Sequence, residues 1–216
     1  MQWAVFTGDI VGSSSVSADR LDAIMHVLEA SCRDLSDWVE PTEPGKTVPL
    51  AGFKRGAGFA RRGGDGWQIA LNRPKFCLRA AIYLQARIRA NGEGDATRIA
   101  VATGDGDPFR GQIVDPNSAH GPAFEKSGRL LQKLGSRTRL AFAGSGLLDA
   151  SFRLADHISQ GWTAAQARAV AAMLPPGSGP RRRVAEDLGI SRQAVDQALN
   201  AAGFPAIDAA LALIEA

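Results

Sequence analysis

Two aspartates follow segments whose residues are typical of buried β-strands. Asp9 comes after the apolar run at residues 3–7 (WAVFT), and Asp65 lies in the glycine-rich turn 63–66 between two β-prone segments. Two carboxylates a few ångströms apart repel each other and are best neutralised by a hard divalent cation such as Mg²⁺ or Mn²⁺. If the fold brings them together, Asp9 and Asp65 form a candidate metal site of the kind that phosphoryl chemistry uses. Ordinary turn chemistry explains the same residues, so a purely structural role stays open.

The loop after Asp9 could add a phosphate site to this metal pair. It precedes a predicted helix, and backbone N–H groups at a helix N-terminus attract phosphate groups. The predicted phosphate-binding residues of this loop are Ile10, Val11, Gly12 and Ser13.

The C-terminal segment RRRVAEDLGISRQAVDQALNAAG has the residue spacing of a helix-turn-helix. Ala185 lets two helices approach closely, Gly189 suits a left-handed turn, and Ser191 caps the next helix. Ile190, Val195 and Leu199 then point back at the preceding helix, and a capping box at 163–166 (TAAQ) begins an earlier helix. The side chains predicted to face DNA are Arg181, Arg182, Arg183, Ser191, Arg192, Gln193, Asp196, Gln197 and Asn200.

DNA binding by this segment competes with a docking role. Polar amides and arginine suit base edges, and the arginine triplet suits phosphates. However, residues 161–216 contain five arginines, no lysine and five acids, so a small helical bundle used only for docking stays open. Because one small module gives little affinity, a DNA-binding form is expected to be a homodimer. The apolar segment 207–216 suits packing or self-association.

The elements expected to position the two aspartates alternate in a recognisable order. The pattern predicts a strand, a helix from Ser17 to Trp38, a connection at 40–48, a hairpin over 58–71, and a helix that Pro74 opens and Asn91 ends. A strand at 98–103, a helix at 122–134 and a strand at 139–143 follow. This βαββαβ order, followed by αβ, predicts an α+β, ferredoxin-like fold: an antiparallel sheet with helices packed on one face.

Length and composition bound the remaining possibilities. The 216 residues, 45% hydrophobic and 22% charged, suit a globular domain at 1–155 and a helix-turn-helix domain at 161–216. Cys32 and Cys77 are expected to be small core residues in a reducing compartment. Without a basic region ahead of an apolar run, and without about 18 consecutive apolar residues, a cytoplasmic protein with no membrane span is expected.

Four motifs in this order resemble those of the palm-type nucleotidyl cyclases and, less closely, the GGDEF diguanylate cyclases. They are GDIVGSS, RRGGDGWQIAL, RIAVATGDG and GPAFEKSGRL. Together with the C-terminal helix-turn-helix, they most resemble the SatD family over nearly the whole chain. The resemblance implies that Asp9 and Asp65 are metal ligands, that Arg61 occupies the base-selecting place, and that Arg129 faces the phosphates. Glu125 stands where cyclases commonly have asparagine, and after Arg129 the late lysine that grips the triphosphate has no counterpart.

These features favour a regulatory protein. A cyclase-like domain would bind Mg²⁺ or Mn²⁺ and a nucleoside triphosphate or other nucleotide, and the helix-turn-helix would bind DNA. Glu125 and the missing lysine disfavour the first alternative, an active nucleotidyl cyclase or related nucleotide-polymerising enzyme with the helix-turn-helix as a docking module. The second alternative is an interaction protein with neither ligand nor DNA.

Overall fold

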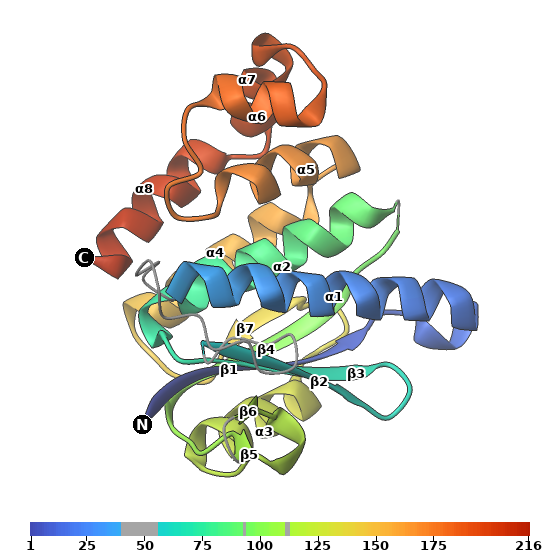
Figure 1. Cartoon of the computed structure of the whole chain (residues 1–216), viewed down its shortest axis with the longest axis vertical. Helices are drawn as coiled ribbons and strands as arrows, with labels where there is room; N and C mark the ends of the chain where they lie inside the picture. Colours follow the sequence, from blue (N-terminus) through green and yellow to red (C-terminus); the bar gives the residue numbers. More distant parts are fainter. Residues whose placement is uncertain (40–55, 93, 111–112) are drawn as a thin grey trace.

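The computed structural model of the chain describes residues 1–39, 56–92, 94–110 and 113–216, so the connection predicted at 40–48 lies outside it. The fold is α+β, with a mixed five-stranded sheet in the order β2-β3-β1-β4-β7 (Figure 1). The strands are β1 (Gln2–Ile10), β2 (Ala57–Arg62), β3 (Gly66–Leu71), β4 (Thr97–Asp105) and β7 (Leu140–Phe142), and a separate ribbon is formed by β5 (Phe109–Arg110) and β6 (Ile113–Val114).

Strand β1 lies at the centre of the sheet and is covered on both faces. Side chains alternate along a strand, so Ala4 and Phe6 enter the main core, whereas Trp3 and Val5 enter a second, smaller core. All four are fully buried. An uninterrupted apolar run is the pattern of a strand that is buried on both sides.

The helices lie on both faces of the sheet (Figure 1). On one face, α1 and α2 pack together over the main core, and on the other, α3 packs against β1 and β4 and contributes Ala123 and Phe124 to the second core. The prediction that all helices share one face was therefore wrong, because Trp3 and Val5 need a cover of their own. The helices up to this point are α1 (Ala18–Val39), α2 (Cys77–Asn91) and α3 (Pro122–Lys133).

The fifth strand makes the sheet mixed rather than antiparallel. Strands β1, β2, β3 and β4 pair antiparallel, but β7 pairs parallel to β4. Helix α3 is the crossover between β4 and β7, and a strand that returns through a helical crossover runs parallel to the strand it left. The expectation of an antiparallel sheet thus fails at its last strand.

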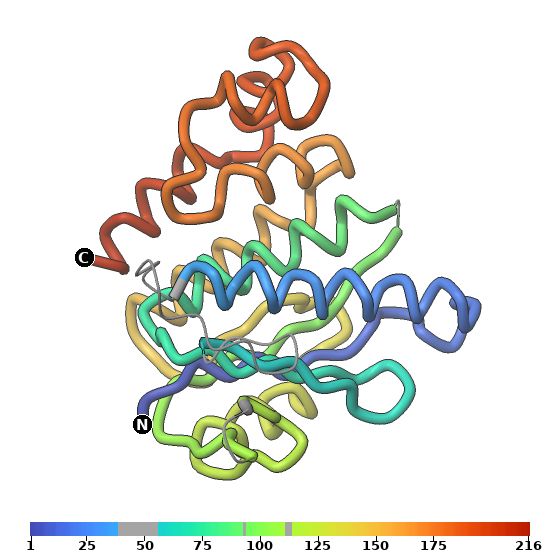
Figure 2. Tube along the Cα trace, in the orientation of Figure 1, coloured from blue at the N-terminus to red at the C-terminus, as the bar shows by residue number. Residues whose placement is uncertain are grey.

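The C-terminal helices continue the main core instead of starting a separate one. Helix α5 packs on α2 (Figure 2). A single cluster of buried residues runs from the sheet to Leu211 in the last helix. Cys32 and Cys77 are buried in the same core. The sequence predicted nothing for the segment that forms α4. The remaining helices are α4 (Leu147–Gln160), α5 (Ala164–Met173), α6 (Arg181–Leu188), α7 (Arg192–Ala201) and α8 (Phe204–Glu215).

Among the described residues, no single helix is long and apolar enough to cross a membrane. Helices α7 and α8 reach that length and composition only when taken together, and a bend of 72° separates them.

Candidate functional site

Asp9 and Asp65 lie at the same edge of the sheet. In the antiparallel pairing of β1 with β3, Asp9 is opposite Gly66, the residue that follows Asp65. The backbone N–H of Ile10 donates to the carbonyl oxygen of Asp65 at 3.2 Å, so the two segments are joined at this point. The strand order therefore brings together two carboxylates that are 56 residues apart in the chain.

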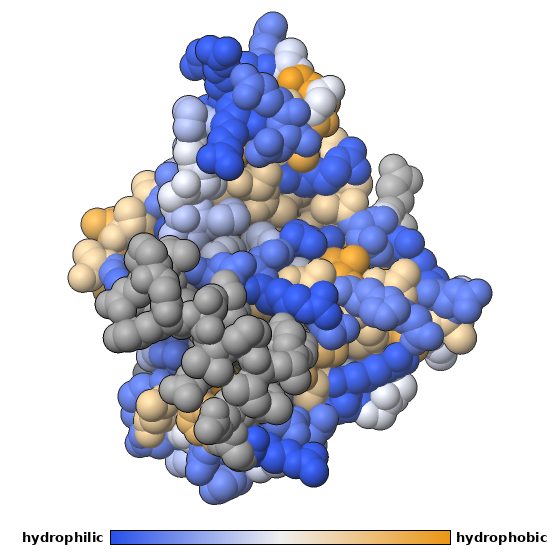
Figure 3. Space-filling view, in the orientation of Figure 1, coloured by the Kyte–Doolittle hydropathy of each residue, from blue (hydrophilic) through white to orange (hydrophobic). Residues whose placement is uncertain are grey.

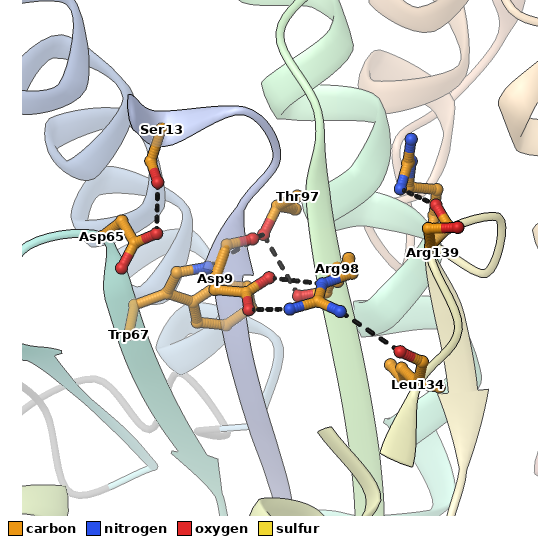
Figure 4. Close-up of polar contacts among 9 residues, drawn as sticks. Asp9, Ser13, Asp65, Trp67, Thr97, Arg98, Leu134 and Arg139 are labelled. Carbon is orange, nitrogen blue, oxygen red and sulfur yellow. Dashed lines mark hydrogen bonds and ion pairs between the residues drawn. The ribbon is translucent and has the colours of Figure 1, made fainter. Parts of the chain in front are cut away.

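The carboxylate of Asp9 is bound by an arginine that the sequence analysis did not single out. Arg98 lies directly opposite Asp9 in β4. Its Nε donates to Oδ1 of Asp9 at 2.8 Å, and its Nη2 donates to Oδ2, so both carboxylate oxygens are engaged (Figure 4). These bonds raise the pKa of Arg98 above its ordinary value, while its partial burial opposes the rise and the charges of Asp9 and Asp65 add to it.

The carboxylate of Asp65 is oriented by the loop that follows β1. Ser13, which begins a single turn of 3₁₀ helix, donates its hydroxyl to Oδ2 of Asp65 at 2.5 Å (Figure 4). Two residues of the predicted phosphate loop are used otherwise, because Ile10 N–H donates to Asp65 and Val11 N–H donates to the carbonyl of Ala96 at 2.9 Å. Gly12 and Ser13 are the remaining residues of that loop.

The buried indole ring of Trp67 packs against the backbone that carries Asp9. The indole Nε1 of Trp67 donates to the hydroxyl of Thr97 at 2.9 Å, and that hydroxyl donates to the carbonyl of Asp9 at 2.7 Å. A Cβ on Gly8 would lie 2.4 Å from the indole of Trp67, so the glycine before Asp9 is needed for the ring to fit. The backbone of Asp9 is therefore held in place by packing as well as by its ion pair.

Of the other residues that the resemblance implies, Arg61 lies beside the turn that carries Asp65, whereas Glu125 and Arg129 lie farther away. Arg61 donates to the carbonyl of Gly64 and, at 2.7 Å, to Asp22 of α1. Glu125 and Arg129 form an exposed ion pair with each other, one helical turn apart on α3. Arg98 reaches the carbonyl of Leu134 at the end of α3, so Glu125, nine residues earlier, lies ~13 Å back along the helix axis.

In this arrangement the residues do not fit a resident divalent cation. Asp9 and Asp65 supply the oxygen donors that such an ion needs, but Arg98 occupies both oxygens of Asp9. Within the described part of the chain, no group of three or more histidine, cysteine, aspartate or glutamate residues could hold a metal. The guanidinium of Arg98 supplies the positive charge that a metal would otherwise bring.

Helices α6 and α7 are joined by a turn of three residues and pack on α5. Gly189 adopts the left-handed conformation with φ 64°, and the hydroxyl of Ser191 caps α7 by accepting from the N–H of Ala194. Val195 and Leu199 are fully buried against the neighbouring helices. The capping box at Thr163 that was expected to begin α5 is also present.

Two residues of this unit differ from expectation. Ile190 does not point back into the bundle but is 45% exposed, because the turn directs it away from the helices. Asp196 does not face outward freely: Arg181 of α6 donates to it at 2.8 Å, and Arg192 approaches it to 3.7 Å. The ion pair between Arg181 and Asp196 joins α6 to α7 and withdraws both side chains from the predicted DNA-facing set.

The other predicted DNA-facing side chains lie on the surface. Arg182 and Arg183 are exposed on α6, and Arg182 pairs with Glu186 one turn away. Hydrophilic residues predominate on the visible face of this unit (Figure 3). The exposed polar residues of α7 are Arg192, Gln193, Gln197 and Asn200.

No protein-family model matches the chain, and no curated protein matches it.

Proposed function

We propose that this protein is a regulator that binds DNA through a helix-turn-helix formed by α6 and α7. The observation that carries the proposal is the outer face of α7, where Gln193, Gln197 and Asn200 are exposed while Val195 and Leu199 anchor the helix. Exposed amide side chains on a rigid helix suit the donor and acceptor pattern of base edges in the major groove.

We further propose that the first unit is a ferredoxin-like palm of the nucleotidyl-cyclase type, of the kind found in the SatD family. The order β2-β3-β1-β4 with antiparallel pairing supports it, because a βαββαβ chain with that order has the ferredoxin-like topology. The position of Asp9 and Asp65 at one edge adds to this support. The pairing of Arg98 with Asp9 favours a regulatory role for this palm over catalysis.

Phosphate contacts in the proposed complex come from Arg182 and Arg183 on α6. Both are exposed, and the pair of Arg182 with Glu186 is open to solvent, whereas Arg181 is engaged by the partly buried Asp196. The C-terminal segment 161–216 has five arginines and five acids, so its electrostatic contribution is small. Specific binding then needs two copies on two half-sites, one helical turn of DNA or a multiple of it apart.

Selection from random DNA with the full-length protein tests this function. We expect a sequence with two half-sites to be enriched. Replacing Gln193 or Gln197 by alanine should weaken binding to it by about 1 to 3 kcal/mol and leave binding to unrelated DNA unchanged.

The arginine variants provide the matched comparison. Neutralising Arg182 and Arg183 together should weaken binding to all sequences and flatten its salt dependence, because phosphate contacts release counterions. Lys126, on α3, gives a control substitution on a different face. If no sequence is enriched, and the Arg182 and Arg183 variant binds bulk DNA as the wild type does, the C-terminal helices are a docking bundle.

A second candidate function is binding of a nucleoside triphosphate together with Mg²⁺ or Mn²⁺ at the edge that carries Asp9 and Asp65. The adjacency of the two carboxylates favours it, and the ion pair with Arg98 opposes it. Binding therefore requires Arg98 to release Asp9.

Titration of Mn²⁺ into the wild type, Arg98→Met and Asp65→Ala, each with and without a nucleoside triphosphate, tests this second function. Removing Arg98 should strengthen Mn²⁺ binding by about tenfold or more, since it frees a carboxylate, and removing Asp65 should abolish it. Equal, weak Mn²⁺ binding by all three proteins would reject the site.

A further inference from the structure

A cleft of about 650 Å³ lies where the first unit meets the C-terminal helices. Its lower wall is formed by the last turns of α1 and by α2, and its upper wall by α5, the two prolines after it and the end of α6. Figure 1 shows these four helices stacked in this order. The volume lies within the range of sites that hold small molecules.

The lower wall carries a connected polar network beside an aromatic pair. The hydroxyl of Tyr83 donates to Asp34 at 2.5 Å, and Nη1 of Arg87 donates to Asp34 at 2.8 Å and to the Tyr83 oxygen at 2.7 Å. Burial raises the pKa of Tyr83, and the bond to Asp34 adds to the rise, so the hydroxyl stays protonated. Trp38 packs edge to face on the Tyr83 ring, with centroids 4.8 Å apart. These contacts give the cleft a fixed aromatic surface.

The upper wall combines one cation with apolar groups. Ala171, Ala172, Pro175 and Leu188 line it, and Arg168 projects from the exposed side of α5. Within the described residues Arg168 makes no ion pair or side-chain hydrogen bond. A guanidinium with its donors available binds a planar anion through two parallel hydrogen bonds.

The charges around the cleft limit what it accepts. Among the described residues of the lining, two arginines, Arg87 and Arg168, balance two acids, Asp34 and Asp37, in formal charge. A polyphosphate carries several negative charges, whereas a single anionic group is matched by the guanidinium of Arg168 alone. The cleft is also remote from Asp9 and Asp65. Asp34 lies 16 residues beyond the start of α1, which is ~24 Å along a helix that begins at the aspartate edge.

We propose that this cleft is a second ligand site, for a small molecule that joins a planar aromatic or heteroaromatic ring to one anionic group. The ring lies between the surface formed by Trp38 and Tyr83 and the apolar residues of α5, and the anion pairs with Arg168. Nucleoside monophosphates and aromatic carboxylates both have this chemistry.

Titrations of the full-length protein in the presence of a chelator test the proposal, because the chelator removes any metal-dependent binding near Asp9. The probes are the nucleoside monophosphates AMP, GMP, CMP and UMP, and the carboxylates anthranilate and indole-3-acetate. Adenosine and guanosine, which have the ring without the anion, and inorganic phosphate, which is the anion without the ring, serve as the two halves of a complete probe. We expect saturable binding of at least one complete probe, by calorimetry and by a change in tryptophan fluorescence, and binding about tenfold weaker or more for its halves.

Two variants and one control assign the site. Arg168→Ala should weaken binding about tenfold or more, whereas Arg153→Ala, an exposed arginine on α4, should leave it unchanged. Trp38→Phe should retain binding but lose most of the fluorescence change. The proposal is overturned if no complete probe saturates, if Arg168→Ala binds as the wild type does, or if the fluorescence change persists in Trp38→Phe.

Discussion

At the scale of single residues, the salt bridge between Arg98 and Asp9 determines whether the edge that carries Asp9 and Asp65 has a free carboxylate. The side chains of Asp9 and Arg98 are only 21% and 28% exposed, so each has given up much of its hydration for the other. A half-buried charge that loses its partner keeps this desolvation cost. The exposed pair of Glu125 and Arg129 on α3, with side chains 62% and 70% exposed, has no such cost.

Replacing Arg98 by methionine should therefore lower the free energy of unfolding by about 2 kcal/mol, because Asp9 is left partly buried without a donor. Urea denaturation of the full-length protein measures this loss. The matched change Arg129→Met should cost less than about 0.5 kcal/mol, as exposed pairs contribute little. Equal losses of unfolding free energy in the two variants would show that the partly buried pair of Asp9 and Arg98 stabilises the fold no more than an exposed pair does.

At the scale of elements, one side chain connects a helix to the edge strand. Oδ1 of Asp156 in α4 accepts the backbone N–H groups of Arg139 and Leu140, at 2.9 and 2.8 Å, where β7 begins. Asp156 is a buried residue, and Leu140 beside it is in the core. The link fixes α4 against β7 and gives the backbone N–H groups of Arg139 and Leu140, at the start of the strand, a hydrogen-bond acceptor.

Asp156→Ala should lower the free energy of unfolding by about 2 to 4 kcal/mol, since one buried and one partly buried backbone donor lose their acceptor. Asp156→Asn keeps an oxygen at the same place and should lose much less. Urea denaturation of both variants measures the difference. A loss in the asparagine variant as large as in the alanine variant would mean that the hydrogen bonds are not the cause.

The same residue predicts a dependence on pH. Burial raises the pKa of Asp156 above its ordinary value, despite the opposing hydrogen bonds, so folding favours its protonated form. Its contribution to stability is thus fully present below the unfolded pKa and is lost as the pH rises through the folded pKa. Relative to the wild type, Asp156→Asn should gain stability as the pH is raised from about 3 to 7, measured by thermal unfolding. A difference that is constant over this interval would contradict the prediction.

The turn between α6 and α7 gives another prediction for a single element. Gly189 has φ 64°, so alanine there should cost about 1 kcal/mol of unfolding free energy. Gly128 lies inside α3, where an added Cβ meets nothing within 4 Å, so Gly128→Ala should stabilise by about 0.5 to 1 kcal/mol. Thermal unfolding compares the two variants. Destabilisation by both would point to a general intolerance of alanine instead of the left-handed turn.

At the scale of the whole molecule, the C-terminal helices are joined to the first unit by more than a linker. Arg79 of α2 pairs with Glu215 of α8 through its Nε and Nη2 and also donates to the carbonyl of Leu174 at 3.0 Å. The two charged side chains are only 11% and 12% exposed. This buried ion pair and the packing of α5 on α2 join the C-terminal helices to the first unit, so that the two share one continuous core.

Because the core is continuous, we expect the full chain to unfold in one cooperative transition, with equal calorimetric and van't Hoff enthalpies. Arg79→Ala should lower the free energy of unfolding by about 3 kcal/mol, since it leaves Glu215 buried without its partner. A double-mutant cycle with Glu215→Ala isolates the coupling. Two resolved transitions in the wild type would show that the units unfold separately.

Local patterns in the sequence were enough to predict the order of the main elements and the chemistry at their ends. The strands around Asp9 and Asp65, the cap at Ser191 and the buried positions Val195 and Leu199 all follow from patterns within about 20 residues, where turn, cap and periodicity rules apply.

Which distant groups meet depends on how the elements pack in the folded chain. Arg98 meets Asp9 through strand register across 89 residues, and Asp196 meets Arg181 through the packing of two helices. Arg98 is a charged residue near the start of the apolar strand β4, which indicated that it needs a partner of opposite charge. The local pattern did not show which residue that partner is. The cover of α3 over Trp3 and the docking of α5 on α2 likewise depend on which faces remain to be buried once the sheet has formed. These contacts depend on several elements at once, because the burial of apolar faces drives the packing. The sequence of a single element does not specify them.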